Sequence, residues 1–276
     1  MTHEATAGGG PDSLYVVEQV PTRPSAPRVV LVHGTMDRST SFAKVARRLD
    51  DLDVVRYDRR GYGRSREAGV GGLATQIDDL LAVIGDRPAV LAGHSFGGTL
   101  SLAAALLRPD LVPSVFVYEA PVPRAWRAGE DQTTEAPLDD PSPLALDRGI
   151  PLDPAGQAER FMRRMIGDRR WERLPTRTRA DRRAEGPALL ADGRSMRTPD
   201  VVVDLADVAV PVVVAWGSAT SARHLAGAQR LLATLADAEP AVIEGADHGA
   251  HLTHPGPFAD LVRRAVGRAG GRAAGR

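Results

Sequence analysis

Along most of this chain, short apolar runs alternate with segments in which apolar residues recur at helical spacing. Residues 28–32 contain a continuous run of mainly β-branched side chains, which is typical of a strand that is buried on both faces. In residues 41–49 and 73–84, apolar side chains return every three or four positions, which predicts amphipathic helices. This alternation predicts an α/β fold, in which helices cover both faces of a mostly parallel sheet.

The same pattern predicts the remaining elements and one interruption. We expect further strands at 13–20, 54–57, 89–92, 114–118, 212–216 and 241–244, and further helices at 98–107, 222–235 and 258–266. Residues 122–198 are instead rich in Pro, Asp and Arg. We therefore predict one α/β domain, formed by residues 13–121 and 199–268, with a mobile, mostly helical cap inserted at 122–198. Residues 1–12 and 269–276 are expected to be disordered tails.

Residues 93–97, with the sequence Gly-His-Ser-Phe-Gly, join a predicted strand to a predicted helix. Glycine lacks a Cβ atom, so the flanking glycines allow a tight turn. A turn of this kind, called a nucleophile elbow, holds a serine hydroxyl out at the carboxyl end of the strand. A glycine-rich turn with no catalytic role can have the same sequence, but the strand–turn–helix setting favours Ser95 as a nucleophile.

A serine hydroxyl is a poor nucleophile at neutral pH and needs an adjacent base. Of the seven histidines, His248 follows the last predicted strand, as the Ser-acid-His chain order of such enzymes requires. The reaction also needs N–H groups that stabilise the oxyanion of the tetrahedral intermediate. We expect these from the backbone of Phe96, directly after Ser95, and of Thr35, in the loop after the strand at 28–32.

These motifs resemble those of the α/β-hydrolase fold superfamily. The matching segments cover most of the chain and lie at residues 33–34, 58–65, 93–98, 245–248 and 254–255. The resemblance implies an eight-stranded, mostly parallel sheet with a cap between its sixth and seventh strands. It also implies hydrolysis by acyl transfer and a mainly structural role for residues 58–65.

The sequence departs from the family at the third member of the catalytic triad. Relatives usually carry an Asp after the strand at 212–216, but residues 218–223 contain no carboxylate. Glu119, which ends the strand at 114–118, is our candidate for the acid, because some superfamily members place it after that strand. Asp247 is a weaker candidate, since neighbouring side chains on an extended loop point apart. In an alternative interpretation the triad is degraded, and the protein binds a small molecule as a receptor does.

A serine nucleophile is compatible with a carboxylic ester, a lactone or a thioester as substrate, cleaved through an acyl-enzyme intermediate. The resemblance implies no metal and no cofactor. Trp126, Phe161 and Met165 are expected to line the acyl pocket. Ten arginines lie between residues 160 and 183, which favours either a cationic rim or, as we prefer, a solvated helical face with ion pairs such as Glu159 with Arg163.

The amino-acid composition limits the classes of molecule that this protein is expected to bind. The formal net charge is zero, which argues against nucleic-acid binding, and there is no cysteine, which excludes disulfides and thiol nucleophiles. The first residues lack the apolar region of a signal peptide, and the longest apolar stretch, near 100–107, is much shorter than the ~18 residues of a membrane span. We expect a cytoplasmic enzyme for a small-molecule acyl substrate, bound to neither nucleic acid nor membrane.

Overall fold

The computed structural model of this protein describes residues 14–273, apart from residues 20, 22, 24 and 127–152. Seven strands in this part of the chain form one sheet, in the order β1-β3-β2-β4-β5-β6-β7. Their bounds are Val16–Gln19 (β1), Arg28–Val32 (β2), Asp53–Tyr57 (β3), Ala89–His94 (β4), Val115–Tyr118 (β5), Val212–Gly217 (β6) and Ala238–Ile243 (β7). Only β1 and β3 pair antiparallel. The predicted α/β fold is confirmed, with seven described strands where the resemblance implied eight.

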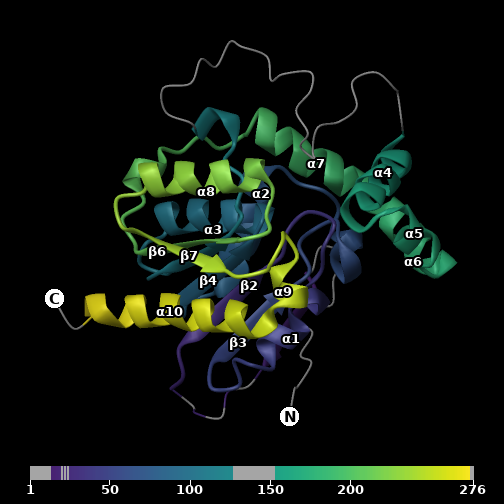
Figure 1. The fold of residues 1–276 in the computed structure, drawn as a ribbon. Helices are drawn as coiled ribbons and strands as arrows, with labels where there is room; N and C mark the ends of the chain where they lie inside the picture. Colours follow the sequence, from purple (N-terminus) through teal and green to yellow (C-terminus); the bar gives the residue numbers. More distant parts are fainter. Residues whose placement is uncertain (1–13, 20, 22, 24, 127–152, 274–276) are drawn as a thin grey trace.

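Helices cover both faces of the sheet (Figure 1). On one face lie α2 (Leu73–Ile84), α3 (Phe96–Leu107) and α8 (Ala222–Thr234). On the other lie α1 (Ala43–Ala46), α9 (Ala250–Thr253) and α10 (Pro255–Ala273). The described residues also form four short 3-10 helices, at Ser39–Phe42, Gly63–Ala68, Arg124–Trp126 and Leu205–Asp207. None of the described helices has the length and apolar character that a bilayer crossing needs.

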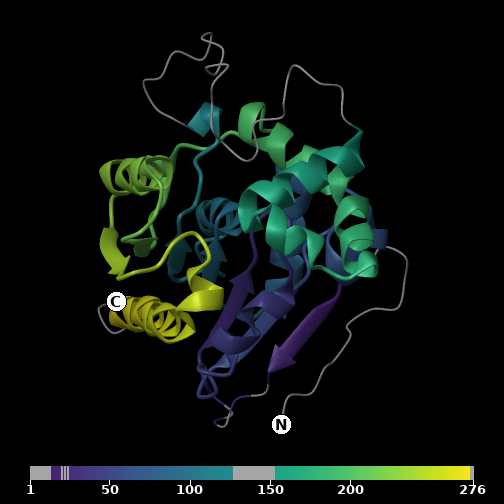
Figure 2. The same ribbon diagram turned by 45° about the vertical axis from the view of Figure 1, so that its right-hand side comes forward.

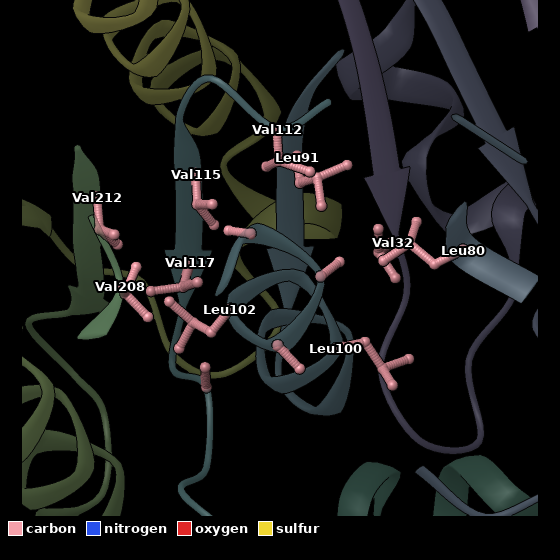
Figure 3. Close-up of a cluster of buried hydrophobic side chains, with 14 of the residues drawn as sticks. Val32, Leu80, Leu91, Leu100, Leu102, Val112, Val115, Val117, Val208 and Val212 are labelled. Carbon is pink, nitrogen blue, oxygen red and sulfur yellow. The ribbon is translucent and has the colours of Figure 1, made fainter. Parts of the chain in front are cut away.

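The strand β2 shows why this arrangement is stable. Val29, Val30, Leu31 and Val32 are each 0% exposed, because successive side chains of a strand point to opposite faces of the sheet. Val30 and Val32 pack in the cluster with α2, α3 and α8, part of which is drawn in Figure 3. Val29 and Leu31 pack in the cluster with α1 and α10. Each buried aliphatic side chain contributes roughly 1.5–3 kcal/mol to stability, so this strand is held from both sides.

In the described part of the predicted insertion, between β5 and β6 in the chain, lie four further α-helices. They are α4 (Pro154–Ile166), α5 (Asp168–Glu172), α6 (Thr176–Ala184) and α7 (Gly186–Arg197). In both views α4, α5 and α6 lie to one side, away from α8 and α10 (Figures 1 and 2). An apolar cluster that includes Phe161 of α4, Trp171 of α5 and Leu189 of α7 packs these three helices against Met36 and Tyr62, in the loops after β2 and β3.

The arginines of these helices pair with nearby carboxylates. The predicted ion pair is present, since Arg163 Nη2 lies 2.8 Å from Glu159 Oε1. Glu159 also accepts hydrogen bonds from Arg183 Nε at 2.6 Å and from the Trp171 indole at 3.1 Å. These contacts agree with the preferred interpretation of a solvated face with local ion pairs.

A buried carboxylate ties α7 to the loops beside the sheet. Asp192 Oδ2 lies 2.7 Å from Arg59 Nη2, and both side chains are 1% exposed. Asp192 also accepts hydrogen bonds from the hydroxyls of Thr35 and Tyr62, both at 2.8 Å, and from the Gln76 amide at 3.0 Å. Burial opposes ionisation of Asp192, but the Arg59 guanidinium holds the pKa of the carboxyl below its usual range.

A second buried carboxylate anchors the start of α7. Glu185 Oε1 lies 2.6 Å from Arg38 Nη2 and accepts the Gly63 N–H at 2.9 Å. Arg182, at the end of α6, donates to the Met36 carbonyl at 2.8 Å. These contacts favour firm attachment of α6 and α7 to the loops after β2 and β3, rather than the mobile cap that we expected. The division into core and cap stays a prediction.

Several element ends differ from the sequence prediction, and those of β7 and α10 are two of them. β7 begins at Ala238, before Pro240, whereas we started the strand at residue 241. Proline is tolerated there because β7 pairs with β6 alone and forms an edge of the sheet. α10 continues to Ala273, so residues 269–273 are helical rather than part of the expected disordered tail.

We expect Asp192→Asn to lower the free energy of unfolding by about 3–5 kcal/mol, because it leaves the Arg59 charge buried without its partner. Urea unfolding followed by circular dichroism measures this change. The matched control is Asp168→Asn, which removes an exposed partner of Arg163 and should change stability by less than about 1 kcal/mol. Equal effects of the two variants would contradict the importance of the buried pair.

Candidate active site

Ser95 lies at the turn between β4 and α3, in a strained conformation. Its φ of 52° and ψ of −128° are unusual for a residue with a side chain. The Ser95 N–H donates to the Tyr118 carbonyl at 2.9 Å, and the Ser95 carbonyl accepts the Gly98 N–H at 2.7 Å. The backbone therefore turns from strand to helix at this residue, as the nucleophile-elbow motif predicts.

The glycines of the elbow permit close backbone packing. A Cβ atom on Gly97 would lie 2.1 Å from the Val32 carbonyl oxygen, and one on Gly93 would lie 2.5 Å from the Gly97 oxygen. Neither position has room for a side chain. The turn can be this tight only because both residues are glycine.

Glu119 directly follows β5, the strand that pairs with β4, which ends just before Ser95. His94 pairs with Tyr118 across the parallel strands β4 and β5, so Ser95 and Glu119 each follow one member of this pair. Glu119 also has a positive φ, 49°, and is 2% exposed. Its carboxylate accepts the Gly217 N–H at 3.0 Å, and its Oε2 lies 2.6 Å from His248 Nδ1.

His248 lies in the loop after β7, next to the end of β4. Its carbonyl accepts a hydrogen bond from His94 Nε2 at 2.8 Å, and the two ring centroids are 4.6 Å apart. Since His94 precedes Ser95, these contacts bring the imidazole next to the elbow. The carboxylate of Glu119 accepts a hydrogen bond from Nδ1–H, so Nε2 carries the free lone pair of the neutral ring.

The hydrogen bond that we expect between Ser95 and His248 is not formed in this structure. Among the described residues, neither the Ser95 hydroxyl nor His248 Nε2 has a hydrogen-bond partner. Such contacts are often long before substrate binds and tighten in the complex.

The protonation states of Glu119 and His248 follow from their surroundings. Burial opposes ionisation of Glu119, but hydrogen bonds from His224 and His248 hold its pKa far below the usual range. Burial lowers the pKa of His248 below its ordinary value, the bond to Glu119 opposes this shift, and His224 adds to it. At neutral pH the pair is therefore a carboxylate and a neutral imidazole.

Asp247, the weaker candidate for the acid, is used elsewhere. Its side chain accepts the Gly249 N–H at 2.8 Å, and its carbonyl accepts the Tyr118 hydroxyl at 2.6 Å. Both contacts shape the loop that carries His248. The carboxylate at His248 Nδ1 belongs to Glu119.

The loop after β2, expected to supply an oxyanion donor, runs close to the elbow. A Cβ atom on Gly34 would lie 2.9 Å from Ser95 Cβ. The Thr35 hydroxyl donates to Asp192, and the Thr35 backbone N–H has no hydrogen-bond partner among the described residues. Phe96 is the first residue of α3, where backbone N–H groups have no partner within the helix. The oxyanion role of these two amides stays a prediction.

His224 is a residue near the site that the sequence analysis did not single out. Its Nδ1 lies 3.0 Å from Glu119 Oε2, and its ring stacks on that of His248 with centroids 4.1 Å apart. The only signal in the sequence was its place in the segment after β6, where relatives usually carry the acid. From its local sequence alone, His224 is an ordinary residue in the first turn of a helix.

The remaining histidines near the elbow have structural contacts. His33 accepts the Arg59 N–H at Nε2 at 2.8 Å and donates from Nδ1 to the Gly34 carbonyl, and burial lowers the pKa of its ring to about 4. His251 Nε2 lies 3.1 Å from Asp37 Oδ2.

Two sets of side chains are close enough to share a metal ion. Within the described chain these are Asp37, His94 and His251, and Glu119, His224 and His248, with ligand atoms within 4.8 Å of one another in each set. In the second set, both imidazole Nδ1 atoms are already used for hydrogen bonds to the carboxylate.

The three expected pocket residues lie in different surroundings. Phe161 is buried in the cluster that also contains Met36, next to the predicted oxyanion residue Thr35. Trp126 is buried in the main core, where its indole donates to the Val201 carbonyl at 2.8 Å. Met165 is 40% exposed. The structure brings only Phe161 near a loop of the site.

The comparisons with known proteins agree with the fold. A sequence model described as "Alpha/beta hydrolase family" matches residues 29–261. The lipase LipV of Mycobacterium tuberculosis is 32% identical over 112 residues, which are 40% of this chain and 42% of that lipase, so the match spans less than half of the relative.

Two solved structures share the fold over nearly the whole chain. The enol-lactonase from Burkholderia xenovorans has a TM-score of 0.67 at 20% identity and covers 92% of this chain and 96% of its own. The thioesterase domain from the curacin biosynthetic pathway has a TM-score of 0.64 at 19% identity and covers 96% and 99%.

We expect Glu119→Gln to lower the pKa of His248 further, because the substitution removes the negative charge and the acceptor that stabilise the imidazolium. NMR titration of the histidine ring signals measures this pKa in both proteins. The control Glu244→Gln changes a carboxylate that binds the Ser218 hydroxyl instead and should leave the titration unchanged. A His248 pKa that is equal or higher in Glu119→Gln would contradict the interaction.

Proposed function

This chain belongs to the alpha/beta hydrolase family, and from that premise we propose that it is a serine hydrolase. In this proposal it cleaves a carboxylic ester, a lactone or a thioester through an acyl-enzyme intermediate. The family makes the protein a hydrolytic enzyme. The observation that carries the serine mechanism is the 2.6 Å contact between His248 Nδ1 and the buried carboxylate of Glu119, which follows the strand next to that of Ser95.

The mechanism follows from the roles of the three side chains. Ser95 attacks the acyl carbonyl, while His248 Nε2 takes the hydroxyl proton and then gives it to the leaving group. Glu119 holds the tautomer with the proton on Nδ1 and stabilises the imidazolium that forms. Water then attacks the acyl-enzyme by the same route, with His248 again as the base, and the acid product leaves.

Stabilisation of the oxyanion is assigned to the N–H groups of Thr35 and Phe96. Each such donor contributes about 3 kcal/mol when it is aimed at the developing charge. The position of Phe96 at the start of α3 and the close approach of Gly34 to Ser95 support this assignment. The hydrogen bond from the Thr35 hydroxyl to Asp192 would keep the loop in place.

We propose that residues 122–198 act as the cap over this site and help to bind a small-molecule acyl substrate. The packing of α4 and α7 against Met36 supports the idea, because it brings Phe161 beside the loop that carries Thr35. The lipase and enol-lactonase among the similar proteins support an acyl substrate. Trp126 and Met165 have less support, since one lies in the core and the other is exposed.

Ser95→Ala should reduce the hydrolysis of a p-nitrophenyl ester by about 10⁴-fold or more, because the reaction loses its nucleophile. It should also abolish covalent labelling by a fluorophosphonate. The control Ser101→Ala removes a hydroxyl that bonds to the Gly97 carbonyl inside α3 and should keep both activities. Turnover that survives in Ser95→Ala would rule out the proposed mechanism.

Glu119→Gln should lower kcat by about 10⁴-fold, as the loss of the triad acid does in serine proteases. The ester assay at saturating substrate measures this effect. Asp247→Asn, which alters the other candidate acid but keeps its contact to Gly249, serves as the control and should stay within about tenfold of the parent. Fluorophosphonate labelling of Ser95 without any turnover in the parent protein would favour the receptor-like alternative.

A further inference from the structure

A second imidazole shares the carboxylate that holds His248. His224 Nδ1 and His248 Nδ1 lie 3.0 and 2.6 Å from the same oxygen, Glu119 Oε2. The two rings are stacked, with their planes 16° apart. The carboxylate is fully buried, while the two imidazoles are 16% and 17% exposed.

The neighbouring arginine determines which form His224 takes. Arg223 Nη2 lies 2.8 Å from His224 Nε2. A guanidinium has only donors, so Nε2 must accept this hydrogen bond and the ring must be neutral, with its proton on Nδ1. That Nδ1–H donates to Glu119, with Thr220 Oγ1 3.3 Å away.

Sharing one oxygen has an electrostatic consequence. Each N–H that binds Oε2 draws on the same negative charge, so the bond from His224 weakens the hold of Glu119 on a protonated His248. The stacked ring also separates one side of His248 from water, which disfavours its charged form. Both effects favour neutral His248.

We propose that His224 is a positioning residue that shares Glu119 with His248 and thereby keeps His248 neutral, and able to accept a proton, at mildly acidic pH. The inference rests on the serine-hydrolase function proposed above. His224 does not touch the reacting atoms in this scheme. It acts through the carboxylate and extends the acidic range in which the base can work.

The charged and titratable groups that face this stack come from several elements. In the described part of the chain they are Glu119 after β5, Arg223 of α8, His94 at the end of β4, Asp247 beside His248, the Tyr118 hydroxyl of β5, and the pair of Asp37 and His251 beyond His94. Burial and its histidine neighbours hold the pKa of His94 well below the ordinary value, so that ring adds no charge. A substitution at His224 leaves all of these groups in place.

His224→Phe tests the inference, because phenylalanine keeps a stacking ring but has no N–H donor. The acidic midpoint of His248, measured by NMR titration and by the pH profile of kcat/KM, should rise by about one pH unit. At one pH unit below the parent midpoint, kcat/KM as a fraction of its plateau value should be about tenfold lower in the variant than in the parent. His224→Asn returns a neutral donor near the Nδ1 position and should restore the midpoint, a rescue that a merely structural role would not predict.

The control His254→Phe removes an imidazole that contacts the Thr253 hydroxyl and should leave the midpoint unchanged. If His224→Phe does not fold, His224→Ala takes its place in the same titration. A midpoint that is the same in the parent and the variant overturns the inference. The parent protein could also lack esterase activity while the NMR midpoint of His248 is still higher in His224→Phe than in the parent. That result upholds the coupling and overturns the proposed function instead.

Discussion

One buried carboxylate, that of Glu119, organises the loops at the carboxyl edge of the sheet. An isolated charge at this depth would cost several kcal/mol, so it is stable only with donors around it. The donors come from Gly217 at the end of β6, His224 at the start of α8 and His248 after β7. Three segments that are distant in the sequence are thus held at one point by the same side chain.

The parallel register explains how the acid and the nucleophile come to be neighbours. β4 and β5 end together, at the paired residues His94 and Tyr118, and the chain bends sharply at the residue that follows each strand. Ser95 and Glu119 both adopt a positive φ there, 52° and 49°. Such backbone strain persists only where the surrounding contacts over-determine the conformation, and it is commonly found at functional sites.

The sequence was sufficient for the parts that depend on local pattern. Strands such as β2 follow from their apolar runs, and Ser95, Glu119 and His248 could be named because each stands at a strand end or in a motif. His224 and Asp192 could not be found in this way. Their partners, Glu119 and Arg59, lie more than 100 residues away in the chain, and neither helical position differs locally from an ordinary surface residue.

The anchoring of α7 has a bearing on how a ligand could reach the elbow. To swing outward, this helix would have to pull Glu185 from Arg38 and Asp192 from Arg59, and the second separation would leave the buried Arg59 guanidinium without its partner. Hinged opening of α6 and α7 as a rigid flap is therefore energetically disfavoured. A ligand therefore has to reach the elbow while α6 and α7 stay attached to the loops after β2 and β3.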